Sequence, residues 1–380
     1  MRLCYVLLSP TWGMHQYTAG LANRMQEGRG NGETGREGPP FEVHLVTTAH
    51  YPADRYSPAV RVHTPVAARD SGFSVEAMWR SWPTARQALA AIRQVDPDVV
   101  HLTGPHLCNP LLLRALRRAG VPTVHSLHDL HPHRGSAYGR LLYLWNGWVR
   151  REAGHLLVHG RRYGDELLAR GVDPARLSCT PLTHLFVGHE QEGMLRRCPP
   201  AVEYGRWALF LGRLEAYKGL DVLVEAAQRA EGSGVGVVIA GPGRLDGQLR
   251  GPLPANVELR AGLAGDDEAV DLFRRCGLVV LPYVEASQSA LVGAAYFFGK
   301  PALVSRAGAL PEYVVEGETG WVVSPGDSQA LAEALGAALA DPDRLARMGR
   351  AGRAWYDEQR QAEGTALRAM YAGLAGCAWS

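Results

Sequence analysis

The sequence predicts an α/β protein built from two doubly wound parallel sheets, one in each half of the chain. Short apolar runs alternate with helix-period segments in both halves, which is the pattern of strands joined by crossover helices. The 380 residues are enough for two domains with a core each. Periodicity is lost over 184–204, where glycines and prolines accumulate, so we expect the linker between the domains there.

The first half begins with an apolar strand and repeats the strand–helix alternation. An apolar stripe of Trp82, Ala85, Leu89 and Ile92 indicates one of its helices. Residues 28–40, GRGNGETGREGPP, are too rich in glycine and charge to pack, and we interpret them as a mobile insertion. Strands are expected at 3–8, 43–47, 60–63, 98–102 and 123–127, and helices at 17–25, 77–95 and 111–119. Residues 138–170 are expected to be helical, interrupted by an apolar run at 156–159.

The second half repeats the alternation of strands and helices and ends with helices. Strands are expected at 208–211, 234–240, 257–259, 278–282, 302–305 and 320–323, and helices from 220 and at 267–275, 290–298, 328–339 and 343–356.

Residues 208–227, ALFLGRLEAYKGLDVLVEAA, indicate an anion site. A buried strand runs into a loop that bears Arg213 and Lys218, and a helix starts directly afterwards, which is how α/β sheets bind phosphate. Gly212 and Gly219 allow the backbone to approach a ligand closely. Arg213 offers a planar fork of donors and Lys218 a compact charge.

The composition is that of an ordinary globular protein, with 46% hydrophobic and 21% charged residues and a net charge of +2, so charge gives no case for a nucleic-acid partner. The charge is uneven, because residues 1–185 hold 21 arginines against 14 acidic residues. This basic half is either a surface for an acidic acceptor or an anionic membrane, or simply a solvated arginine surface.

The cysteines and the N-terminus predict a cytoplasmic protein. The N-terminal apolar run is too short for a signal peptide and no run approaches the roughly 18 residues that span a bilayer. Peripheral attachment at the inner membrane face stays open. Six scattered cysteines without a C-x-x-C pair indicate reduced thiols: Cys4, Cys108, Cys179, Cys198, Cys276 and Cys377.

Three motifs occurring in order carry a family resemblance. GRLEAYKGLDVLVEA is followed by AGPG at 240–243 and by LPYVEASQSALVGAAYFFGKPALVSRAGALPEYVVEGETGWVVSPGD. The chain resembles the retaining GT-B glycosyltransferases of family four, loosely over 3–185 and closely over 205–360. The resemblance implies two Rossmann-like domains facing across a cleft. Residues 1–190 would hold the acceptor, residues 205–360 the nucleotide sugar, and residues 361–380 would form a helix that packs back on the first domain.

The resemblance also implies a donor site. The family's diphosphate-holding cations match Arg213 and Lys218, which we therefore expect to be catalytic, since fixed cations stabilise the charge left on the phosphate. Backbone donors at the start of the following helix would add its positive end. The donor-binding residues implied are Gly13, Gly212, Gly241, Gly243, Leu263, Glu285, Gln288, Ser289 and Ala290.

The sequence departs from the family at two places. Ala286 and Ala294 stand where the family commonly has two glutamates, and Glu285 lies one residue from the first. The chain thus resembles a branch that lacks the glutamate pair, so how the ribose is held stays open. Trp12 replaces the first of two adjacent glycines, and it either stacks on an acceptor or packs in the core or a lid.

His128 matches the family's N-domain histidine, and we expect it to contact the reacting sugar with Asp129 orienting it. Among its neighbours, His131 is expected to face the acceptor. His125, His128, His131 and His133 do not have the spacing of a tetrahedral metal set. Two Asp-x-Asp pairs are interpreted as a strand entry and a helix cap: Asp96/Asp98 and Asp341/Asp343. We therefore expect no metal and no other cofactor.

These observations together predict a retaining, metal-independent glycosyltransferase acting in polysaccharide or glycoconjugate biosynthesis. It would move a hexosyl group from a nucleotide sugar to an unknown glycan, lipid-linked or small-molecule acceptor. The alternative is a non-catalytic binding subunit that has kept the GT-B fold and lost the chemistry.

Overall fold

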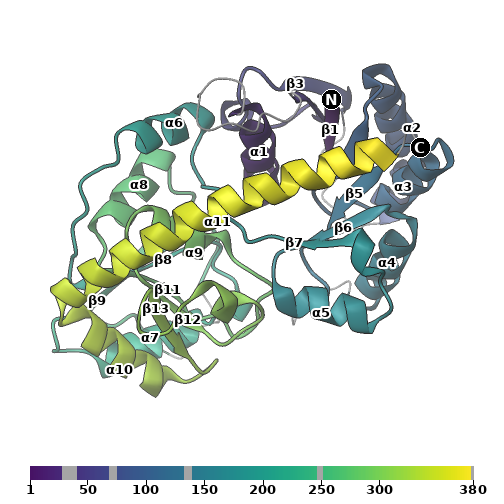
Figure 1. Cartoon of the computed structure of the whole chain (residues 1–380). Helices are drawn as coiled ribbons and strands as arrows, with labels where there is room; N and C mark the ends of the chain where they lie inside the picture. Colours follow the sequence, from purple (N-terminus) through teal and green to yellow (C-terminus); the bar gives the residue numbers. More distant parts are fainter. Residues whose placement is uncertain (28–40, 68–74, 132–138, 246–250, 378–380) are drawn as a thin grey trace. The chain divides into compact units, whose positions relative to one another are not determined.

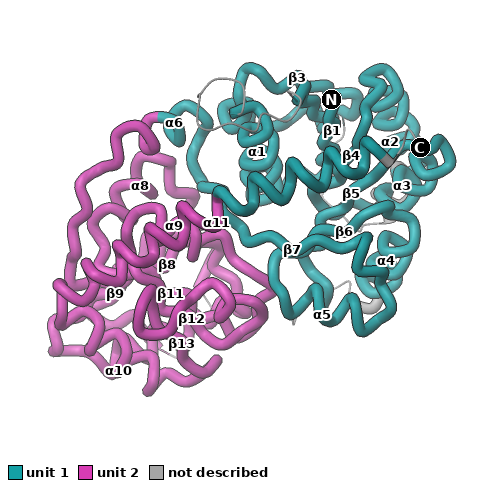
Figure 2. Tube along the Cα trace, viewed as in Figure 1, with its two compact units in different colours: residues 1–132, 136–193, 361–380 teal, residues 133–135, 194–360 magenta. Residues whose placement is uncertain are grey.

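The computed structural model describes residues 1–27, 41–67, 75–131, 139–245 and 251–377, and the side chains of 75–80 and 139–140 are left out (Figure 1). The insertion expected at 28–40 lies outside the described residues. The chain forms two compact units (Figure 2). Unit 1 holds the chain up to Gly193 and again from Gln361, and unit 2 is made by Met194–Arg360.

The described part of unit 1 contains a seven-stranded parallel sheet in the order β3-β2-β1-β4-β5-β6-β7. The order reverses between β1 and β4, which is the topological switch point of a doubly wound sheet. The first strand is almost wholly buried, as expected for a central strand covered on both faces. The strands are β1 (Arg2–Leu7), β2 (Glu42–Thr48), β3 (Arg61–Val66), β4 (Val99–Leu102), β5 (Thr123–Ser126), β6 (His155–Val158) and β7 (Leu177–Cys179).

Helices connect most of these parallel strands. They are α1 (Trp12–Glu27), η1 (Ala53–Arg55), α2 (Val75–Val95), α3 (Asn109–Arg118), α4 (Gly139–Glu152), α5 (Arg161–Ala169), η2 (Pro174–Arg176) and, crossing into unit 2, α6 (His189–Arg197).

In unit 2 the described residues form a six-stranded parallel sheet in the order β10-β9-β8-β11-β12-β13, with its switch point between β8 and β11. The strands are β8 (Trp207–Leu211), β9 (Gly236–Gly241), β10 (Val257–Ala261), β11 (Leu278–Leu281), β12 (Ala302–Ser305) and β13 (Gly320–Val323). The helices are η3 (Ala216–Lys218), α7 (Leu220–Arg229), α8 (Asp266–Arg275), α9 (Ala290–Phe297), η4 (Leu310–Tyr313), α10 (Ser328–Leu339) and α11 (Pro342–Cys377). The predicted fold class, two Rossmann-like α/β domains, is confirmed.

Three local expectations were wrong. The stretch 184–204 is not all irregular, because α6 forms within it, with acidic residues in its first turn and arginines in its last, which favours a helix. Trp82 is 63% exposed, although Ala85 and Ile92 of the same predicted stripe are buried, because the buried face of α2 also includes Ala88 and passes beside Trp82. The helices expected at 343–356 and 361–380 form a single helix, because α11 runs unbroken over 36 residues.

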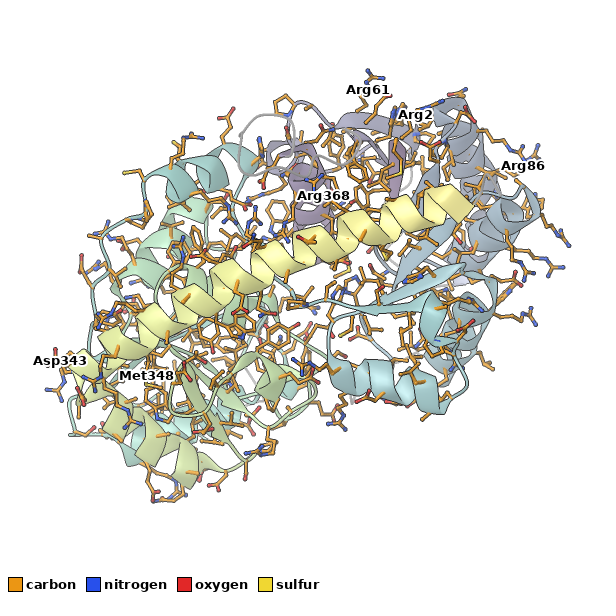
Figure 3. All side chains as sticks on the ribbon, in the orientation of Figure 1. Arg2, Arg61, Arg86, Asp343, Met348 and Arg368 are labelled. Carbon is orange, nitrogen blue, oxygen red and sulfur yellow. The ribbon has the colours of Figure 1, made fainter. Side chains whose placement is uncertain are left out.

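The C-terminal part of α11 is anchored within unit 1. Arg24 of α1 forms an ion pair with Glu363, and Thr183 donates a hydrogen bond to the same carboxylate. Arg24 also donates to Thr183 Oγ1 at 2.8 Å, and both charged side chains are buried. Arg368, labelled in Figure 3, donates to the Arg24 carbonyl at 2.8 Å. This buried charge pair, with the hydrogen bonds of Thr183 and Arg368 around it, holds the helix against α1.

No helix in the described ranges is both long and apolar enough to cross a bilayer.

Candidate active site

The predicted phosphate loop lies at the switch point of the unit 2 sheet. Gly212 follows β8 and adopts φ 144°, and its N–H donates to the Ala240 carbonyl at 2.9 Å. A Cβ on Gly241 would lie 2.0 Å from the Gly212 carbonyl oxygen, so only glycine fits where the ends of β8 and β9 meet. In α/β sheets this edge, outside the carboxyl ends of the strands, is where ligands bind.

Arg213 reaches out from this loop with its side chain 60% exposed. Its guanidinium forms an ion pair with Glu215 at 2.6 Å and lies 3.5 Å from the Tyr217 hydroxyl. The pair holds the guanidinium beside the loop. An anionic ligand would therefore compete with Glu215 for the same donors.

Lys218 lies against two aromatic rings. Its ammonium is 3.8 Å from the ring centre of Tyr283 and 4.9 Å from that of Tyr217, both within cation–π range. Burial lowers the pKa of Lys218, but its interactions with Tyr283 and Tyr217 outweigh burial and leave the pKa above its ordinary value. Lys218 has no carboxylate partner among the residues that the structure describes. It is a positioned cation whose charge no described carboxylate neutralises, and its role toward a ligand stays a prediction.

The segment after β11 packs directly on the Lys218 loop. The N–H of Val284 donates to the Tyr217 carbonyl at 2.9 Å and that of Glu285 to the same oxygen at 3.3 Å. Gly219 adopts φ 67°, and a Cβ there would lie 2.1 Å from the Pro282 carbonyl oxygen. The chain can approach this closely only because residue 219 is glycine.

Gln288, Ser289 and Ala290 lie at the N-terminus of α9. Ser289 is its N-cap and accepts a hydrogen bond from the Leu291 N–H at 3.3 Å. Leu291 also lies next to the space above Gly212. The positive end of α9 is thus brought beside the loop that carries Arg213, as an anion site requires.

The remaining donor-site predictions lie at neighbouring strand ends. Gly243 adopts φ 126° and pairs with Leu214 through an isolated bridge. Gly262 donates to the Gly241 carbonyl at 3.0 Å, and Leu263 follows it with 68% of its surface exposed. An exposed leucine at this edge offers an apolar face to a ligand.

In unit 1, His128 follows β5 at the carboxyl edge of its sheet. Its Nε2 lies 2.7 Å from the Thr103 carbonyl oxygen, which only accepts, so Nε2 carries the proton and Nδ1 the lone pair. Burial lowers the pKa of His128 below its ordinary value, more than the Thr103 carbonyl and Asp129 raise it. His128 is therefore neutral at pH 7, with its tautomer set by Thr103.

The other unit 1 site residues lie at the start of α1 and in the loop after β5. Trp12 begins α1, is 38% exposed and is covered by the Arg55 guanidinium at 4.6 Å from its ring centre. Gly13 has open space where a Cβ would be. His131 is held between Tyr143 at 3.1 Å and Glu166 at 2.9 Å. Their roles toward an acceptor stay predictions.

Sequence reasoning missed the side chains that set the charge of this site. Glu215 and Tyr217 lie within the motif itself, so their spacing to the two cations was available as a signal. Tyr283 lies 65 residues beyond Lys218, and only the parallel pairing of β8 with β11 places it under the ammonium.

The interior of unit 1 contains a cluster of neutral histidines around Tyr17. Its ring makes edge contacts with His128, His159 and His184, at 4.7, 5.0 and 5.6 Å between ring centres. Nearby, His125 Nε2 accepts from the Asn109 amide at 3.0 Å, so it has no room for a second proton. Burial lowers the pKa of His125 and of His184 to about 3 in each case.

The cluster makes stability depend on pH. In the unfolded chain these histidines bind protons below their ordinary pKa of 6.5, whereas in the folded protein they stay neutral there. The contribution of each neutral histidine to the free energy of unfolding is therefore complete above pH 6.5. Below that pH it falls by about 1.4 kcal/mol for each pH unit. Denaturant unfolding between pH 7 and 5 measures this slope. His125→Gln should flatten it while His50→Gln, an exposed histidine, should not, and equal slopes for both variants would contradict the assignment.

Comparisons with known proteins match both halves of the chain. A family described as "Glycosyl transferase 4-like domain" matches residues 13–183, and one described as "Glycosyl transferases group 1" matches residues 199–355. A glycogen synthase of Mycobacterium tuberculosis is 28% identical over 292 residues, which cover 70% of this chain and 66% of that protein. A GDP-mannose-dependent alpha-mannosyltransferase of the same species is 29% identical over 294 residues, covering 72% and 73%.

A solved structure shows the same fold. Anabaena Alr3699/HepE in complex with UDP-glucose superposes with a TM-score of 0.68 at 15% identity, covering 97% of this chain and 98% of that one. The fold is that of the GT-B glycosyltransferases. Within that architecture, the chain combines a region similar to glycosyl transferase 4-like domains with a region similar to glycosyl transferases of group 1.

Proposed function

We propose that this protein is a retaining, metal-independent glycosyltransferase that moves a hexosyl group from a nucleotide sugar to an acceptor. One observation supports the proposal: Arg213 and Lys218 both contact Tyr217, and Leu291 of α9 lies beside Gly212, at the switch point of the unit 2 sheet. Relatives that are glycosyltransferases do not favour a non-catalytic role.

The chemistry follows from where charge develops. Breaking the bond between the anomeric carbon and the phosphate oxygen leaves charge on the diphosphate, and Arg213, Lys218 and the α9 amides would stabilise it. Each charge-assisted hydrogen bond contributes about 1.5–3 kcal/mol. Alanines at 286 and 294 provide no carboxylate nucleophile. We therefore propose that the diphosphate leaves from, and the acceptor attacks, the same face of the donor sugar. The acceptor oxygen then bonds the anomeric carbon while its proton passes to the leaving phosphate.

Metal independence is supported by what the paired aspartates do. Asp98 accepts the Arg2 backbone N–H at 2.7 Å at the start of β1, and Asp96 pairs with Arg2 at 3.2 Å. Asp341 accepts the Arg344 N–H at 2.8 Å and so caps α11. One aspartate of each pair, Asp98 and Asp341, is thus engaged by a backbone N–H. We expect turnover to survive EDTA.

A panel of donors tests the function. The relatives' names and complexes include both GDP-mannose and UDP-glucose, so UDP-, GDP- and ADP-sugars should all be tried, with released nucleotide as the readout. We expect one nucleotide to be released preferentially and the product to keep the donor's anomeric configuration, read by NMR. A chain that releases no nucleotide and binds none of UDP, GDP and ADP in calorimetry would contradict the proposal.

We propose that the protein works in the cytoplasm, bound peripherally at the inner membrane face through its basic N-terminal half. The buried thiols of Cys4, Cys108 and Cys276 are unpaired with one another, as a reducing compartment allows.

Removing the ion-pair partner of Arg213 should tighten donor binding. Glu215→Gln keeps the size of the side chain but frees the guanidinium for the diphosphate, and we expect the donor KM to fall a few-fold with little change in kcat. The effect is small because the pair is exposed and contributes about 0–1 kcal/mol. Glu225→Gln, which breaks the exposed Arg229 pair on α7, is the matched control. A higher KM for Glu215→Gln would instead show that Glu215 positions Arg213 for binding.

A further inference from the structure

Helix α4 of unit 1 exposes an apolar stripe on its outer side. Leu141, Leu144 and Trp148 are spaced as one helical face, and they are 38%, 73% and 38% exposed. Arg151 continues the same stripe with its side chain 68% exposed. An outward helix face of a globular protein is normally polar, so this stripe is unusual.

The stripe is not needed to pack the protein, because α4 buries its opposite face. Trp145, Asn146 and Val149 are 6% exposed or less. Trp145 donates to the His106 carbonyl at 3.1 Å, and Asn146 donates to the Asp129 carbonyl at 2.9 Å. Helix α4 is thus apolar on two sides, and its buried side alone packs it against the rest of unit 1.

The charge around the stripe is positive. Glu152 is the one acidic residue of α4, and its carboxylate is 1% exposed between Arg117 at 2.9 Å and Arg151 at 3.3 Å. The neighbouring α3 contains no acidic residue and exposes Arg117 and Arg118. The two helices pack side by side (Figure 1). We call Leu141, Leu144, Trp148, Arg117, Arg118 and Arg151 the α3–α4 surface.

We propose that the α3–α4 surface docks this protein on an anionic lipid bilayer, with α4 lying along the interface. Leucine and tryptophan on one face with arginines beside them is the composition of interfacial helices, whose apolar face enters the acyl boundary while the cations meet lipid phosphates. The absence of any exposed acidic group on α3 and α4 complements a negative surface. This inference rests on the peripheral membrane contact proposed above and names its surface.

Vesicle sedimentation of the full chain tests the proposal. Phosphatidylcholine vesicles containing phosphatidylglycerol should pull down the protein, and pure phosphatidylcholine vesicles should pull down much less. Leu144→Ser should lower the partition coefficient about tenfold, because it removes the most exposed apolar group of the stripe. Arg118→Gln should lower it less and should reduce its salt dependence.

Matched variants outside the α3–α4 surface distinguish docking through this surface from non-specific adsorption to lipid. Met194→Ser removes a side chain that is 56% exposed on α6, and Arg86→Gln removes an exposed cation on α2 (Figure 3), and neither should change binding. Donor hydrolysis in the absence of lipid should be unchanged by Leu144→Ser, so failure of membrane docking is distinguishable from failure of the proposed activity. The proposal would be overturned if Leu144→Ser and Met194→Ser bound vesicles equally well. It would also be overturned if the wild type did not bind vesicles but formed a dimer in solution that Leu144→Ser dissociates.

Discussion

Lys218→Ala should lower donor turnover by about 10³-fold, the upper range for removing one preorganised group that stabilises developing charge. The ammonium lies over Tyr283 and has no carboxylate partner among the described residues, so its charge is left for the diphosphate. Losing its contacts with the Tyr283 and Tyr217 rings should cost about 0.5–2 kcal/mol, so the protein should stay folded with a slightly lower melting temperature. Nucleotide release from the preferred donor measures the loss.

The chain's other lysine provides the control. Lys300 is fully buried, and its ammonium donates to the carbonyls of Glu203 and Cys276. Lys300→Met should therefore lower stability, because two buried carbonyls lose their donor, and leave turnover intact where the protein remains folded. Near-normal turnover by Lys218→Ala would contradict both the site and the proposed function.

Glu363→Ala should lower the free energy of unfolding of unit 1 by about 3–5 kcal/mol, since it leaves the Arg24 guanidinium buried without its counter-ion. Thr183 loses its acceptor as well. Denaturant unfolding, followed by a probe within unit 1, measures the change.

An exposed pair on the same helix provides the comparison. Arg353 and Asp357 are 2.8 Å apart with Asp357 half exposed, so Asp357→Ala should cost less than about 1 kcal/mol. The double variant Arg24→Leu with Glu363→Leu should recover most of the stability, because apolar groups can replace a buried pair. If Glu363→Ala costs no more than Asp357→Ala, the buried pair does not anchor α11.

Local patterns predicted much of this molecule. The alternation of strands and helices predicted both sheets, and the position of Arg213 and Lys218 after a buried strand predicted where an anion site would form. Short-range patterns misjudged α11, because helix ends depend on what each turn packs against. Gly349 and Gly352 let this helix approach Gly299 and Tyr296, where a Cβ would lie within 1.9 and 2.5 Å of them.

Strand periodicity, glycine conformation and side-chain charge are local properties, so they predicted the two doubly wound sheets and the loop of Gly212, Arg213 and Lys218. Long-range contacts set the surroundings of the charges in that loop. Tyr283 reaches Lys218 through the pairing of β8 with β11, and α4 exposes its apolar stripe only because Trp145 and Val149, not Leu144, are buried. Contacts between residues far apart in the chain have no local period, so they appear only once the sheets have formed.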